Sequence, residues 1–144
     1  MSERPGPLDR WHQIAESRDP AALAELLSDD CVFRSPAVHT PQEGHAITTA
    51  YLSAALVVLG PTLTYQHEWW DEHSAVLEFT AELNGLTVHG VDMLRWGGDG
   101  RLVEFTVMVR PFKGLTTLME LMAAELAAKL WDKSLEQAGV SFDL

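Results

Sequence analysis

A single carboxylate, Asp92, interrupts a run of apolar residues that alternates in the manner of a β-strand, residues 87–96. A glycine-rich turn at residues 97–100 leads into a second apolar strand, residues 102–110, so the two segments predict a β-hairpin. An acidic side chain is rarely buried without a hydrogen bond, an ion pair or a bound proton. The position of Asp92 therefore predicts an apolar pocket that contains one acid.

The composition limits the class of protein and its partners. A chain of 144 residues is expected to form one domain, residues 1–144, with the Pro-rich residues 1–7 flexible. Its net charge of −11 disfavours binding to nucleic acid, which needs a basic surface, and to an anionic membrane. Cys31 is the single cysteine, so no internal disulfide can form, and a reducing cytoplasm is the expected compartment.

No segment is expected to be a leader or to span a membrane. The first ten residues contain no apolar run of the kind found in a signal peptide. The longest uncharged stretch, residues 46–66, is broken by Gly60 and Pro61. Its helical part is shorter than the roughly 20 residues that cross a bilayer.

The order of predicted elements indicates an α+β fold. Helices are expected at residues 8–17 and 21–27, the second with Asp19 as N-cap and Pro20 at its first position. A short strand, a loop and a helix follow at residues 31–35, 38–43 and 44–59; strands then come at 63–70, 75–83, 87–96 and 102–110, and a long helix at 114–138. We expect a curved antiparallel sheet that wraps round the N-terminal helices as a cone, with an extra C-terminal helix.

Several short motifs occur in an order typical of one superfamily. They include Asp19-Pro20, the stretch 27–33, Ser35-Pro36, a helix after Gly44, and the stretch 90–96 followed by 99–102. With this order the chain resembles the nuclear-transport-factor-2-like superfamily, especially its SnoaL-like and ketosteroid-isomerase-like members. The resemblance implies a cone-shaped cavity. It leaves the activity open, because this fold carries isomerases, cyclases, dehydratases, hydrolases and non-catalytic modules.

The resemblance places one of three ketosteroid isomerase groups in this chain. Asp92 matches the aspartic acid that those enzymes carry on a late strand, a carboxyl that its apolar site keeps protonated and neutral. The position of the carboxylate base falls on Ser35, and that of the tyrosine falls near Trp11. Ketosteroid isomerisation by the known mechanism is therefore not expected. Epoxide hydrolases of this fold need an Asp-Arg-Asp set, of which only Asp92 and Arg110 can be placed.

Strand alternation and the resemblance together select the residues expected around the cavity. The inner faces carry Asp92 as the candidate catalytic residue. The candidate ligand-binding residues are Trp11, Ser35, His39, Phe79, Phe105 and Val107. An apolar pocket with one acid suits a small apolar or amphipathic molecule. Residues 67–73 contain two histidines but lack the helical spacing of a zinc motif, so neither a metal nor a cofactor is expected.

Two functions remain open. Asp92 is either a general acid/base of isomerase, cyclase or hydratase type, or a structural acid bonded to Trp11, a tyrosine or water in a non-catalytic binding or dimerisation module. Arg110 is expected to pair with Glu78 or Glu104 on the outer face of the sheet. The apolar stripe of the last helix, Leu115 to Leu130, can pack on the cone, close the cavity or cover a homodimer seam; we favour the homodimer.

Overall fold

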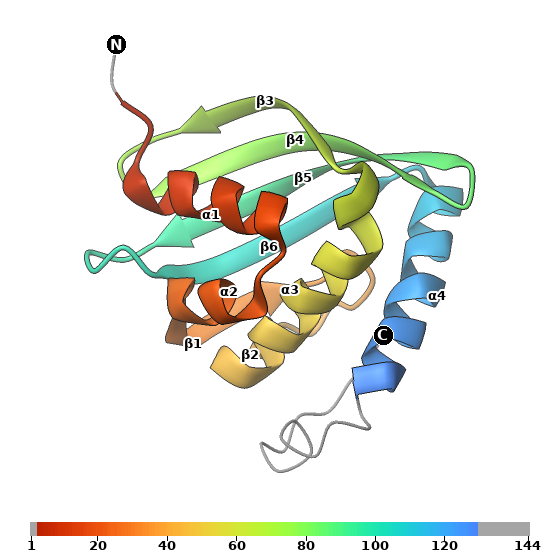
Figure 1. The fold of residues 1–144 in the computed structure, drawn as a ribbon, viewed down its shortest axis with the longest axis horizontal. Coiled ribbons are helices and arrows are strands. Elements are labelled where there is room, and N and C mark those ends of the chain that lie inside the picture. Colours follow the sequence, from red (N-terminus) through yellow and green to blue (C-terminus); the bar gives the residue numbers. More distant parts are fainter. Residues whose placement is uncertain (1–2, 130–144) are drawn as a thin grey trace.

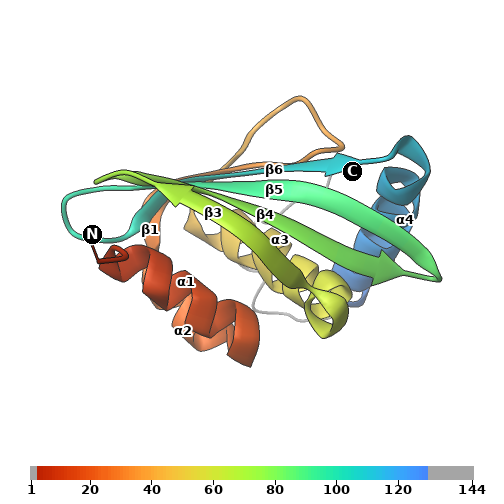
Figure 2. The same ribbon diagram turned by 90° about the horizontal axis from the view of Figure 1, so that it is seen from above.

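Helices cover one face of a curved sheet in the computed structural model, which describes residues 3–129 (Figure 1). The elements are α1 (Gly6–Ser17), α2 (Pro20–Leu26), β1 (Leu27–Arg34), β2 (Gln42–Glu43), α3 (His45–Leu59), the short 3-10 helix η1 (Gly60–Thr62), β3 (Thr64–Trp70), β4 (Ser74–Leu83), β5 (Leu86–Trp96), β6 (Leu102–Arg110) and α4 (Phe112–Lys129). Figure 2 shows the sheet bent over α1, α2 and α3, with α4 at one end. The predicted α+β fold is confirmed. The predicted end of the last helix, including Leu130, lies outside the described residues.

Local sequence signals explain where two helices begin. The Asp19 side chain accepts a hydrogen bond from the backbone N–H of Ala21, and Pro20 occupies the first helical position, as predicted. Helix α3 begins after Gly44, whose φ of 115° is rarely adopted by residues with a side chain. These two starts orient α2 and α3 against the same face of the sheet.

The sheet has the strand order β2-β1-β6-β5-β4-β3. Neighbours from β6 to β3 are antiparallel, but β1 runs parallel to β6, which differs from the expected fully antiparallel sheet. Strand β1 also begins at Leu27, where we expected the end of a helix and a three-residue break. Asp29 and Asp30 are therefore exposed residues of a strand rather than of a turn.

The predicted alternation of the central strands is confirmed. In β5, Val88, Gly90, Asp92 and Leu94 are buried, whereas His89, Met93 and Arg95 lie on the outer face. The same holds for β4, whose Ala75, Leu77, Phe79 and Ala81 are buried. Asn84 and Gly85, both at positive φ, form the tight turn between β4 and β5 as predicted. Cys31 is fully buried and belongs to the core.

Helix α3 is the apolar helix of the core. With η1 it forms a stretch, His45–Thr62, that is long and apolar enough to cross a membrane, but 44% of it is buried inside the fold. Tyr51, Leu52 and Ala54 pack completely inside. The helix therefore serves as a core helix of a soluble fold. It forms one wall of the space beneath the sheet.

Candidate functional site

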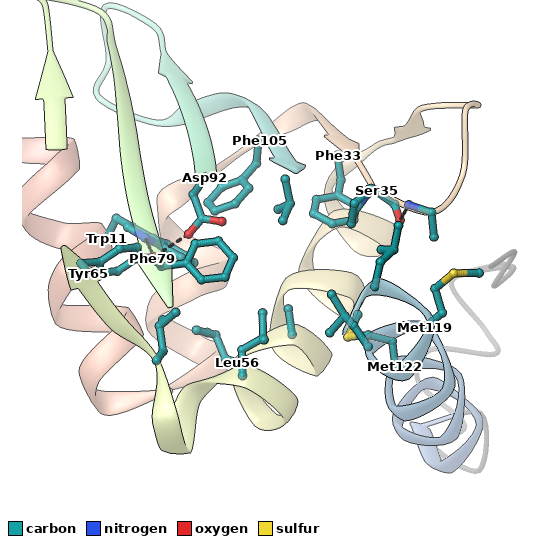
Figure 3. A pocket seen from close by; sticks show the side chains of 18 residues that line it. Trp11, Phe33, Ser35, Leu56, Tyr65, Phe79, Asp92, Phe105, Met119 and Met122 are labelled. Atoms are coloured by element: carbon teal, nitrogen blue, oxygen red, sulfur yellow. Dashed lines mark hydrogen bonds between the residues drawn. The ribbon is translucent and has the colours of Figure 1, made fainter. Parts of the chain in front are cut away.

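A cavity lies between the inner face of the sheet and the helices (Figure 3). Strand residues Phe33, Phe79, Phe105 and Val107 and helix residues Leu56 and Met122 form apolar walls. The full lining is Trp11, Phe33, Ser35, Pro36, Ala37, Ala55, Leu56, Leu59, Leu63, Tyr65, Phe79, Asp92, Phe105, Val107, Leu115, Leu118, Met119 and Met122. Asp92 is its one acidic member, so any charge in the cavity comes from this carboxyl.

The cavity is open to solvent. Together with this opening, its empty volume is about 670 Å³.

Asp92 is held by a chain of two hydrogen bonds. The Tyr65 hydroxyl donates to Oδ2 of Asp92 at 2.5 Å, and Nε1 of Trp11 donates to the Tyr65 hydroxyl oxygen at 2.9 Å. The three residues come from β5, β3 and α1, and Figure 3 shows the carboxyl pointing into the cavity with one oxygen towards Tyr65. Asp92 is only 6% exposed. Of the partners expected for Asp92, which were Trp11, a tyrosine or water, the structure shows a tyrosine, and Trp11 reaches the acid through it.

Burial controls the ionisation of this pair. Desolvation raises the pKa of Asp92 to about 7, although the hydrogen bond from Tyr65 favours the charged form and opposes the rise. Burial also raises the pKa of Tyr65 well above its ordinary value, and the nearby Asp92 carboxylate raises it further. Tyr65 therefore stays protonated as a donor, while Asp92 exchanges its proton near neutral pH.

The structure gathers most of the predicted site residues round the cavity. Trp11, Phe79, Phe105 and Val107 line it with Asp92, and the ring of Trp11 packs edge-on against Phe105 at 4.8 Å. Ser35 also lines it, and Figure 3 shows it far from Tyr65. Its hydroxyl accepts a hydrogen bond from the backbone N–H of Ala37, which is ordinary turn geometry.

Two expectations were wrong. His39 is exposed on the loop before β2 and does not line the cavity, because the chain turns outward after Ala37.

Arg110 is exposed at the end of β6 and forms no ion pair with the residues that the structure describes. Glu104 instead lies near Arg34 and Arg95, and Glu78 binds two histidines. An Asp-Arg-Asp set of the epoxide hydrolase type therefore cannot form round Asp92.

Tyr65 was not predicted as a site residue. It lies opposite Phe79 in the β3–β4 pair, and a bulge between Tyr65 and His67 then shifts the register by one residue. The bulge puts Glu68 on the same face, where it binds Arg4 at 2.8 Å and His12 at 2.9 Å. These bonds hold α1, and with it Trp11, over the start of the hydrogen-bond chain.

Helix α4 forms the remaining wall. Leu115, Leu118, Met119 and Met122 line the cavity, and Leu118, Met122 and Leu126 are buried. The described part of the apolar stripe thus packs on its own chain and lines the cavity, and its expected place at a homodimer seam stays a prediction. Between residues 3 and 129, no group of three His, Cys, Asp or Glu side chains has the arrangement of a metal site.

Comparison with known proteins gives the family. The profile of the SnoaL-like domain matches residues 8–105, which is more than half of the chain. The chain belongs to the SnoaL-like family. The matched residues of this SnoaL-like protein include Trp11, Tyr65 and Asp92 and end before α4.

Solved structures with the same fold include named enzymes. A steroid delta-isomerase from Pseudomonas aeruginosa is 39% identical over 86% of this SnoaL-like protein and 91% of that chain, with a TM-score of 0.81. An uncharacterised protein with a cystatin-like fold from Silicibacter pomeroyi is 22% identical over 92% and 94%, with a TM-score of 0.82. The epoxide hydrolase/cyclase-like enzyme SalBIII of salinomycin pyran ring formation is 16% identical over 72% and 88%, with a TM-score of 0.60.

These similarities establish a nuclear-transport-factor-2-like fold, as the sequence motifs predicted. No curated protein sequence gives a significant match. The two more distant structures support the fold alone. The chemistry of this SnoaL-like protein has to be argued from its own cavity.

Proposed function

We propose that this protein binds a small, mostly apolar molecule in the cavity and that Asp92 acts on its polar group as a general acid/base. The observation that carries the proposal is a buried carboxyl, alone in an apolar wall, whose pKa lies at about 7. General acid/base catalysis is most efficient when the pKa of the group is close to the working pH. The geometry thus supports isomerase, cyclase or hydratase chemistry.

The named activities of two similar structures fit this proposal. One is a steroid delta-isomerase and another is an epoxide hydrolase/cyclase-like enzyme. Our proposal departs from ketosteroid isomerisation by the known mechanism, because the position that the resemblance gives to the base is Ser35. A serine hydroxyl without a neighbouring base cannot take a proton from carbon. We therefore infer a reaction that needs one acid/base group rather than two.

A second candidate is a non-catalytic binding protein in which Asp92 is structural. The hydrogen bond from Tyr65 favours it, since this bond satisfies one carboxyl oxygen without any ligand. Asp92→Asn separates the two candidates, because its amide oxygen can still accept the hydrogen bond from Tyr65. Ligand binding and turnover should stay unchanged in this variant if the acid is structural, and they should fall if the acid acts on the ligand.

We also propose a cytoplasmic homodimer that binds neither nucleic acid nor membranes. The net charge of −11 supports the proposed lack of binding to nucleic acid and to anionic membranes, because both attract basic surfaces. The outer face of the sheet supports the dimer, because Trp69, Met93 and Met108 are exposed there. Trp69 and Met93 are both register partners of Val76, so they form one continuous row across three strands.

Dye binding tests whether the cavity is the binding site. N-phenyl-1-naphthylamine is neutral and fluoresces when it enters an apolar space, so the protein is expected to increase its emission. Ala55→Trp places an indole in the cavity and should abolish the increase, because Ala55 is a lining residue. Val57→Trp is the matched control, since Val57 is 50% exposed on the same helix. Equal emission with Ala55→Trp and the control would contradict binding in the cavity.

A further inference from the structure

Helix α4 closes one end of the cavity. Figures 1 and 2 both place it at the end of the sheet opposite to α1, with α3 between the two helices. Its side chains that line the cavity are Leu115, Leu118, Met119 and Met122. None of these four carries a charge or a hydroxyl group. The end of the cavity that α4 forms is therefore apolar.

The acid lies away from this end. Figure 3 shows Asp92 and Tyr65 on one side of the cavity and Met119 and Met122 on the opposite side. A ligand that places its polar group at Asp92 therefore directs its apolar part towards α4. Ser35 lies on the same side as Met119, but its hydroxyl already accepts a hydrogen bond from the backbone of Ala37. A neutral hydroxyl also binds a polar group less strongly than a carboxyl that can ionise.

Helix α4 is held in place along its length. Gly114 at its start lies so close to β5 that a Cβ atom there would come within 2.6 Å of Cγ1 of Val88. Leu118, Met122 and Leu126 follow at four-residue intervals on one face and are 5%, 7% and 1% exposed. A helix that is packed in this way does not move aside for a longer ligand. The space at this end is therefore set by the size of the α4 side chains.

Methionine suits a wall of adjustable depth. Its side chain is unbranched and has three rotatable bonds, so it adapts to the shape of a neighbour. Met122 is buried, whereas Met119 is half-buried. An apolar tail that reaches Met119 removes the rest of its surface from water, which favours binding.

We infer that Met119 and Met122 are specificity-determining residues, which set how long an apolar tail the cavity accepts. The ligand class is an elongated amphipathic molecule with its polar group at one end. The inference rests on the proposed function, because it takes the polar group of the ligand to lie at Asp92. It adds the opposite end of the ligand, which the acid does not touch.

A series of straight-chain alcohols from 1-butanol to 1-dodecanol measures the depth of the cavity. Each methylene group that enters an apolar space raises the affinity by about fourfold. The affinity should therefore rise with chain length and level off where the tail reaches α4. Isothermal titration calorimetry gives these affinities. The chain length at which they level off is compared among variants, so that the limited solubility of the longer alcohols affects all proteins equally.

Two substitutions should move this chain length in opposite directions. Met122→Ala removes the thioether end of the side chain and should allow tails that are about two carbon atoms longer. Met119→Trp enlarges the wall and should shorten the accepted tail by a similar amount. A general loss of packing cannot produce both shifts. Should Met122→Ala fail to fold, Met119→Ala at the half-buried position replaces it and should also allow longer tails.

Leu126→Ala is the matched control. Leu126 is buried on the same face of α4 but is not a lining residue of the cavity. This variant should lose stability as other buried large-to-small changes do, and its accepted tail length should stay that of the wild type. The same lengthening in Leu126→Ala as in Met122→Ala would overturn the inference, since it would reflect a loosened helix.

Failure of the inference and failure of the proposed function give different results. If the alcohols bind but the accepted length is the same in the wild type, Met122→Ala and Met119→Trp, the cavity binds ligands and α4 does not measure them. This result also covers a ligand bound in the reverse direction, with its hydroxyl at Ser35. If none of the alcohols binds the wild type, the proposed function is contradicted, and the inference that rests on it is overturned with it.

Discussion

Phe79 lies directly across from Gly90 on the inner face of the sheet, and a Cβ atom at Gly90 would come within 2.7 Å of its ring. The same atom would lie 2.3 Å from the backbone carbonyl of Met108 on β6. Gly90 therefore leaves room for the aromatic wall of the cavity and for close pairing of β5 with β6. Asp92 follows two residues later on the same face of β5. The close pairing of strands at Gly90 therefore also positions the Asp92 side chain on the inner face.

Gly90→Ala should destabilise the protein by about 1–3 kcal/mol or more, since neither the Met108 carbonyl nor the Phe79 ring can move freely. Gly98→Ala is the matched control, because no atom lies within 4 Å of a Cβ there. Urea unfolding compares the two variants. Equal stability of both would mean that β5 shifts at no cost and that the inner face is not closely packed.

Asp92→Asn should change how stability depends on pH. The pKa of Asp92 is about 7 in the folded chain and 3.8 in the ordinary state, so the folded protein binds this proton more tightly. The stabilisation from Asp92 is then complete below about pH 4 and is lost as pH rises to about 7, with a total of up to about 4 kcal/mol.

The asparagine variant lacks this loss. Its free energy of unfolding relative to that of the wild type should rise between about pH 4 and pH 7 and level off above pH 7, as measured by urea unfolding at each pH. The contributions of the other titratable groups cancel in this difference of unfolding free energies, because both proteins contain them. Parallel curves for the two proteins would show that Asp92 titrates normally in the fold.

Ser35 leads to a prediction about steroid chemistry. We expect no isomerisation of a standard Δ5-3-ketosteroid at the rates of authentic isomerases, because a hydroxyl held by the Ala37 N–H is no proton acceptor for carbon. Ser35→Asp supplies a carboxylate at the edge of the cavity and should raise any residual rate by roughly 10²-fold or more. Wild-type turnover equal to that of authentic isomerases would refute the assignment of Ser35 to the base position.

The sequence predicted the fold and the inner face well, because alternation over long strands leaves little freedom. Asp92, Phe79, Phe105 and Val107 all follow the period of two and all line the cavity. The same rule could have predicted Tyr65 as a lining residue, since it lies two residues after Leu63 and two such residues share one face of a strand. It escaped prediction because the histidine-rich stretch that follows carries a bulge, and a bulge leaves no clear mark in the sequence.

Other errors came from contacts between distant segments. The parallel pairing of β1 with β6 joins residues about 70 positions apart, and no local pattern encodes it. His39 follows Ser35 closely in sequence, but the chain turns outward between them. The apolar stripe of α4 showed that the helix would be buried, but not whether its cover would be α3 and the cavity or a second copy of the chain.

Removal of α4 tests its role as a wall. A chain that ends at Pro111 lacks Leu118 and Met122, which are buried against the cavity. Exposure of the cavity should weaken binding of N-phenyl-1-naphthylamine by tenfold or more and lower the unfolding temperature. A truncated protein that binds the dye as tightly as the full chain would show that α4 is dispensable for the site.

The outer face of the sheet predicts the oligomeric state. Met108 is 54% exposed and Trp69 is 58% exposed there, and such apolar side chains are best covered by the same face of a second copy. Light scattering of the full chain at micromolar concentration is expected to give a dimer. Met108→Lys should weaken it, because two-fold pairing brings the new charges close together. Val57→Lys, exposed on α3 away from the sheet, is the control and should stay dimeric. A wild-type monomer across this concentration range would end the proposal of pairing through the sheet.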